Sequence, residues 1–170
     1  MESFRADDLT QEIMSLYESS FSVIEKIPYV NIRRTLGKGG ELISFHDEGR
    51  FVGFSFVFRD ADRVFLVYLA VCPDLRSKGY GGRILSSVRD TFNGCDIFLP
   101  MESLDPGADD LDTRKRRYDF YIRNGCRDSG FTCVSDDYPF TIMVLQGNVT
   151  KDEADSLITE YEDIHNGRRP

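Results

Sequence analysis

The sequence lacks a hydrophobic run long enough to cross a membrane. Its longest apolar stretch, Val64 to Val71, is far shorter than the ~20 residues that a membrane-spanning helix needs. The initial segment MESFRADDLTQE has no apolar stretch behind its charged residues, whereas a secretory signal has one. We therefore expect no membrane partner and no secretion.

An excess of positive charge is also lacking. The 29 acidic residues outnumber the 21 lysines and arginines, which leaves a net charge of −8 and an isoelectric point near 4.8. A surface of this sign repels a phosphate backbone, so we expect no nucleic-acid partner.

Cysteine and histidine are too few and too scattered for a zinc site. The sequence has 4 cysteines and 2 histidines, with no CxxC pair, so we expect no metal. An even number of cysteines leaves two disulfides formally open, but a chain of 170 residues does not need them. We expect reduced thiols and a cytoplasmic protein. These residues are Cys72, Cys95, Cys126, Cys133, His46 and His165.

No internal repeat, low-complexity segment or Pro/Gly/Ser-rich linker divides the chain. With 41% hydrophobic and 29% charged residues, the composition is that of a globular protein. We expect one domain over residues 1–148 and an amphipathic helical tail over residues 149–170. The tail either packs on the same domain or contacts a second copy of the chain in a homodimer.

The hydrophobic periodicity predicts an α/β (α+β) fold with a mixed, mostly antiparallel central sheet of about six to seven strands, flanked by helices. Asp8 and Gln11 have capping-box spacing at the first helix. In residues 64–71 both alternating sets are largely apolar, which predicts a central strand covered on both faces. We expect helices at 8–20, 29–36, from 79 and at 113–124, and strands at 41–46, 51–58, 64–71, 96–101, 131–135 and 140–146, the last two joined by residues 136–139.

The most informative segment follows the predicted central strand. Pro73 ends that strand, and a glycine-rich turn then opens a helix. Such a turn exposes backbone N–H groups at the positive end of a helix, and glycine lets the chain approach a ligand closely. It predicts an anion-binding turn, and a capped helix start with solvated basic residues is the structural alternative. The turn contains Arg76, Ser77, Lys78, Gly79, Gly81 and Gly82.

Two common nucleotide motifs are missing from this turn. The pattern G-x-x-x-x-G-K-[ST] is absent, and the glycines do not give G-x-G-x-x-G with an acidic residue at the usual distance. Nucleotide hydrolysis and dinucleotide reduction are therefore weaker interpretations.

Two motifs resemble the GNAT family of N-acetyltransferases. The segment Arg76-Ser77-Lys78-Gly79-Tyr80-Gly81 matches the family's Q/R-x-x-G-x-G/A signature between a strand and a helix. Residues 117–125, RYDFYIRNG, are similar to its F-Y-x-x-x-G-F segment, although Cys126 stands where the family usually has Phe. The resemblance, with its order of elements, covers roughly residues 9–146.

The resemblance implies an acetyl-CoA-dependent N-acetyltransferase that acts on a primary amine of a small molecule or peptide. Acetyl-CoA would bind as co-substrate, with its pyrophosphate on the amides of residues 76–82, Tyr80 included. Its pantetheine arm would pair with the backbone near Leu69 and Val71. Glu25 and Tyr29 would then line the acceptor pocket.

Acetyl transfer needs a group that takes a proton from the amine and a group that gives one to the departing thiolate. Tyr121 fits the family's proton donor, although a helical tyrosine can equally belong to the core. Glu102, which follows a predicted strand, is the candidate base, although most exposed glutamates have no such role. Two alternatives stay open: a non-catalytic acyl-CoA-binding regulatory module, and an acidic protein-interaction domain.

Overall fold

The computed structural model describes residues 1–23, 25–135 and 138–169. Within these residues, no helix is both long and apolar enough to cross a bilayer. The helices are α1 (Gln11–Ser20), α2 (Tyr29–Thr35), α3 (Tyr80–Thr91), α4 (Leu111–Arg123) and α5 (Lys151–His165), with a short 3-10 turn, η1 (Pro73–Leu75). The strands are β1 (Glu2–Ala6), β2 (Gly40–Asp47), β3 (Arg50–Arg59), β4 (Arg63–Val71), β5 (Asp96–Glu102), β6 (Arg127–Ser135) and β7 (Tyr138–Gln146).

The strands form one sheet with the order β1-β2-β3-β4-β5-β7-β6. Strands β4 and β5, which α3 connects, pair in parallel, and the other neighbours pair antiparallel. A strand that returns through a helix to the same sheet arrives parallel to the first. The predicted mixed, mostly antiparallel sheet flanked by helices is therefore confirmed.

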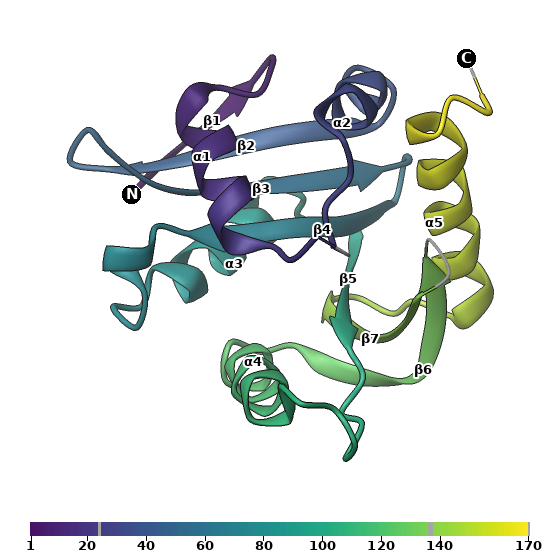
Figure 1. The fold of residues 1–170 in the computed structure, drawn as a ribbon. Coiled ribbons are helices and arrows are strands. Elements are labelled where there is room, and N and C mark those ends of the chain that lie inside the picture. Colours follow the sequence, from purple (N-terminus) through teal and green to yellow (C-terminus); the bar gives the residue numbers. More distant parts are fainter. Residues whose placement is uncertain (24, 136–137, 170) are drawn as a thin grey trace.

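The parallel pair separates soon after it begins. Only Arg63–Phe65 of β4 pair with β5, where their partners are residues 96–98. Both strands continue beyond this pairing. The Asp96 amide donates to the Asp62 carbonyl, at the edge of β5 that faces β4. Backbone N–H groups alternate between the two edges of a strand, so the N–H of residue 100 would point to this same edge. Pro100 has no N–H to donate. Figure 1 shows the result, with β4 and β5 running apart.

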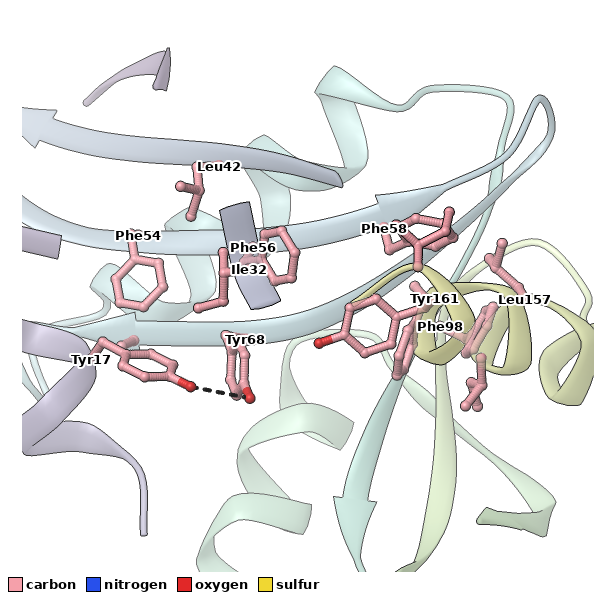
Figure 2. Packing of buried hydrophobic residues seen from close by; sticks show 14 of the residues in the cluster. Tyr17, Ile32, Leu42, Phe54, Phe56, Phe58, Tyr68, Phe98, Leu157 and Tyr161 are labelled. Atoms are coloured by element: carbon pink, nitrogen blue, oxygen red, sulfur yellow. Dashed lines mark hydrogen bonds between the residues drawn. The ribbon is translucent and has the colours of Figure 1, made fainter. Parts of the chain in front are cut away.

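Helices cover both faces of the sheet. One buried cluster lies under α1, α2 and α5, and a second lies under α3 and α4. In Figure 2, Phe54, Phe56 and Phe58 of β3 extend along the first cluster towards Tyr161 of α5. Alternation along the strand explains this row, because every second side chain points to the same face. A packed core therefore lies on each face of the sheet that contains the gap between β4 and β5.

Helix α5 packs onto the first cluster. Leu157 and Ile158 are buried there, and the Tyr161 ring lies 5.6 Å from that of Phe58. A capping box between Thr150 and Glu153 starts the helix. The predicted tail thus contributes to the core of the domain that precedes it.

Three details differ from the sequence-based expectation. Strand β1 was not predicted; its residues are mostly exposed at the sheet edge, so they show no apolar alternation. Helix α1 is capped by Thr10, because the Asp8 carboxylate accepts from the Leu9 amide and pairs with Arg33 instead. Of the predicted link over residues 136–139, positions 136 and 137 lie outside the described residues, and the other two belong to β7.

Candidate functional site

The turn before α3 has the geometry of an anion-binding site. Ser77 and Gly79 adopt positive φ angles of 60° and 84°, so the backbone bends sharply into the helix. Among the described residues, the amides from Ser77 to Gly82 donate to no backbone carbonyl. The unpaired N–H groups of a helix start can bind an anion. We call residues 76–82 the cradle.

Two glycines of the cradle let α4 approach closely. A Cβ on Gly81 would lie 2.9 Å from the Phe120 ring, and one on Gly82 would lie 2.3 Å from the Asn124 amide oxygen. Cβ atoms essentially never make contacts this short, so a side chain at either position would force Phe120 or Asn124 to shift. The glycines therefore serve helix packing as well as access to the backbone.

The positive charge beside the cradle comes from the turn and from α4. Arg83 forms an ion pair with Asp47, so much of its charge is neutralised. Arg116 and Arg123 of α4 line the cavity beside the cradle together with Arg76. Arg116 and Arg123 are seven residues apart, which places them on one face of α4. The sequence already showed this spacing, but the basic run around Arg116 is equally typical of a solvated helix face.

Backbone groups of β4 face the gap opposite β5. The Cys72 amide donates to the Val52 carbonyl of β3. Because antiparallel partners alternate between bonded and non-bonded pairs, Leu69 and Val71 direct their backbone groups away from β3. The Val71 carbonyl accepts from Arg76 Nε at 3.1 Å, whereas its N–H points into the gap. An extended ligand can pair with this open edge.

Two cavities meet at the gap. The cradle-side cavity, of about 840 Å³, is lined by Leu69, Val71, Arg76, Ser77, Gly79, Gly81 and Gly82, and by one face of α4. The tail-side cavity, of about 340 Å³, lies between the α1–α2 loop, β5 and the end of α5. The residues common to both linings are Phe21, Glu25, Leu69, Arg117 and Tyr121.

An ionic cluster lies where the cavities meet. Arg117 Nη1 contacts the Glu102 carboxylate and lies 3.6 Å from Glu25 Oε1. The second oxygen of Glu102 is buried without a hydrogen-bond partner among the described residues. Beside this cluster, burial raises the pKa of the Tyr121 hydroxyl, and the Arg117 guanidinium opposes that rise. Tyr121 is thus a protonated phenol, 9% exposed, between the two cavities.

Three of the predicted site residues point elsewhere. Lys78 is exposed and lines neither cavity. The Tyr80 hydroxyl donates to Asp47 at 2.9 Å, so only its backbone belongs to the cradle. Tyr29 donates to Glu18, and burial followed by this hydrogen bond raises its pKa to about 12. Glu25, by contrast, lines both cavities.

No pattern in the sequence indicated that α5 forms part of this site. Tyr161 and His165, both buried, line the tail-side cavity with Asn166. Their helical spacing predicted an apolar face, but not which surface it covers. Elsewhere in the described part of the chain, no group of three or more His, Cys, Asp or Glu side chains is arranged to hold a metal ion.

These features define a class of fold: a mixed sheet whose one parallel pair separates, with an anion-binding turn and two cavities at the separation. No protein-family model and no curated protein matches the sequence. Comparison with solved structures does find similar chains, 214 in number. The chain has the GNAT fold, in agreement with the two sequence motifs.

Three of the similar structures illustrate the match. A Bacteroides thetaiotaomicron protein assigned to the GNAT family of acetyltransferases is 22% identical, with a TM-score of 0.70 over 91% of this chain and 89% of its own. An aminoglycoside 6'-N-acetyltransferase complexed with coenzyme A is 16% identical, with a TM-score of 0.63 over 88% and 100%. The ribosomal-protein-S18-alanine N-acetyltransferase from Escherichia coli is 13% identical, with a TM-score of 0.57 over 88% and 98%.

Proposed function

We propose that this protein is an acetyl-CoA-dependent N-acetyltransferase that acts on a primary amine of a small molecule or peptide. The observation that carries the proposal is the meeting of two cavities at Tyr121 and Arg117, one of them beside the cradle. Two substrates entering from opposite sides can meet there, which is what a group transfer requires. The coenzyme A in the similar aminoglycoside acetyltransferase supports the choice of co-substrate.

The residues of the cradle-side cavity fit a molecule of this kind. The amides from Ser77 to Gly82 and the guanidinium of Arg76 would hold a pyrophosphate, and the backbone of Leu69 and Val71 would pair with an extended arm. When bound, acetyl-CoA supplies an activated acyl thioester. The Val71 N–H points into the gap, where it can stabilise developing negative charge.

Two side chains at the junction have the chemistry for proton transfer. The Glu102 carboxylate lines the tail-side cavity and can accept a proton from the amine. The Tyr121 hydroxyl lines both cavities, and its raised pKa keeps its proton available for a departing thiolate at neutral pH. Glu102 and Tyr121 thus remain the candidate base and acid.

The proposal is tested first by binding. We expect acetyl-CoA to titrate to one site per chain and to raise the melting temperature, because a ligand that binds only the folded state stabilises it. Absence of binding at millimolar acetyl-CoA would reject the proposal and favour an acidic protein-interaction domain.

The second test is turnover with a panel of amines, followed by the release of free thiol from acetyl-CoA. We expect acetyl transfer to at least one amine. Binding of acetyl-CoA without transfer to any of them would favour the non-catalytic acyl-CoA-binding module instead. A cytoplasmic location and a homodimer stay predictions of the sequence.

A further inference from the structure

The tail-side cavity has a small volume and a largely aromatic lining. Its volume of about 340 Å³ is at the lower end of the range for small-molecule pockets. Rings come from four parts of the chain: the α1–α2 loop, β4, β7 and α5. The phenylalanine and tyrosine residues of the lining are Phe21, Phe65, Tyr68, Tyr138, Phe140 and Tyr161. A flat ring of similar size can pack against such walls.

The charges of the cavity favour a cation at one end. Glu25 and Glu102 both line it, and they share the single guanidinium of Arg117. The other cation of the lining, Lys26, pairs with Glu18 at 2.6 Å. At the end where Glu25 and Glu102 lie, two carboxylates face one guanidinium, a net charge of −1. Arg117 and Lys26 are already paired with carboxylates, so an incoming carboxylate would find no unpaired lysine or arginine among the described residues of the lining.

The carboxylates of Glu25 and Glu102 mark the position for the cation. Glu102 Oε2 has no hydrogen-bond partner among the described residues, and leaving a buried acceptor unpaired is costly. A primary ammonium has three N–H donors and a positive charge, so it can pair with the two carboxylates at this end of the cavity. The carboxylate end of the cavity thus favours the amino group of a ligand, and the aromatic side chains favour its ring.

We propose that the acceptor is a small aryl-alkyl amine with one ring, one primary amino group and no carboxylate. This inference rests on the proposed function and names the substrate class of the same site. An amino acid is excluded because its carboxylate would lie beside Glu25 and Glu102 without a free cation to pair with. An aliphatic diamine is disfavoured because it has no ring to pack against the aromatic side chains of the cavity.

The first test measures binding with matched probes. We would titrate 2-phenylethylamine, 2-phenylethanol, phenylalanine and 1,4-diaminobutane into the protein by calorimetry, with and without coenzyme A. We expect 2-phenylethylamine to bind at least about tenfold tighter than each of the others, because each lacks the ammonium or the ring, or adds a carboxylate. Equal binding of phenylalanine or of the diamine would overturn the inference.

The second test uses a pair of charge variants. Glu25→Gln should weaken the binding of 2-phenylethylamine about tenfold. It should also reduce the ratio between the affinities for 2-phenylethylamine and for phenylalanine. The amide oxygen of Gln can still accept from the Ser22 amide, which Glu25 now does at 2.8 Å, so the loop should keep its structure. Glu12→Gln removes the same charge from the exposed side of α1, outside both cavities, and should leave both affinities unchanged. Unchanged selectivity in Glu25→Gln would contradict the inference.

Turnover separates this inference from the proposed function. If 2-phenylethylamine binds selectively but no acetyl transfer occurs, the proposed function fails and the ligand class stands. If acetyl transfer proceeds equally well on phenylalanine, the proposed function stands and the ligand class is wrong.

Discussion

The phenol of Tyr121 combines two properties that a general acid needs. It lines both cavities, and burial raises its pKa while the nearby Arg117 opposes the rise. A group whose pKa is raised above its usual value of 10.0 keeps its proton throughout the neutral range. The hydroxyl can therefore donate to a thiolate without first having to be protonated from solvent.

Replacing Tyr121 by Phe should lower kcat by about tenfold to a thousandfold with little change in acetyl-CoA affinity. The substitution keeps the ring and its packing and removes only the proton donor. Steady-state kinetics and an acetyl-CoA titration would measure the two effects. A wild-type rate, with loss only in the free energy of unfolding, would reassign Tyr121 to the core.

Glu102→Gln tests the candidate base. The variant still offers an oxygen to Arg117 but cannot accept a proton from an ammonium. We expect the rate to fall most at low pH, where free amine is scarce and a base contributes most. A pH–rate profile measures this, with Glu25→Gln for comparison, because loss of a binding charge should raise KM more than it lowers kcat. A profile of unchanged shape would assign Glu102 to positioning Arg117.

At the scale of elements, the cradle joins the end of β4 to the start of α3. Gly81 is a poor position for a charge test, because a Cβ there already meets Phe120 at 2.9 Å. Ser77 is better suited, since it lines the cradle-side cavity, is exposed, and has a φ of 60° that Asn and Asp both tolerate.

Ser77→Asp should weaken acetyl-CoA binding at least about tenfold, because it places a negative charge beside the expected pyrophosphate. Ser77→Asn has nearly the same shape without the charge and should bind close to the wild-type level. Calorimetric titration of both variants separates charge from shape. Equal affinities in the two variants would mean that the pyrophosphate binds elsewhere.

Asp47 connects the β2–β3 hairpin to the first turn of α3. Its carboxylate pairs with Arg83 at 2.9 Å and accepts from Tyr80, and the Arg83 hydrogen bond lowers its pKa below the usual 3.8. A lowered folded-state pKa means that the stabilisation is complete above the unfolded pKa and is lost as the pH falls through the folded one.

Asp47→Asn should therefore lower the melting temperature at pH 7, and the difference from wild type should shrink below about pH 4. Thermal melts across this range would measure it. Asp62→Asn serves as the matched charge control, because Asp62 is exposed and forms no ion pair within the described part of the chain. If Asp47→Asn lowers the melting temperature equally at every pH, the variant has lost a packing contribution rather than a charge interaction.

At the scale of the whole molecule, α5 closes one end of the tail-side cavity and also fills the core. Leu157 is fully buried, and Tyr161 and His165 reach the cavity lining. Stability and acceptor binding should therefore depend on the same helix.

Leu157→Ala should lower the free energy of unfolding by about 2–5 kcal/mol in a single cooperative urea transition. Thr159→Ala, on the exposed side of the same helix, should change it little. A separate early transition of the tail, with the remaining domain as stable as before, would show that α5 is an independent unit.

Most elements of the fold could be predicted from the sequence because their signals are local. The double apolar alternation of β4, the stripe on α3 and the turn glycines each lie within one short segment. Strand β1 could not be predicted, because an exposed edge strand pairs through its backbone and needs no particular side-chain pattern. The cap at Thr10 was misplaced because Asp8 has a competing partner far along the chain, Arg33.

The sequence by itself predicted the anion-binding turn, because residue type and spacing along one strand–turn–helix unit are enough for it. Tyr121 became a candidate through the resemblance to the GNAT family, and Glu102 through its place after a predicted strand. Only the tertiary structure decided that Arg117 pairs with Glu25 and Glu102, and that α5 closes the second cavity. These contacts join segments far apart in the chain. Their geometry depends on how the helices pack on the two faces of the sheet, which short-range periodicity does not encode.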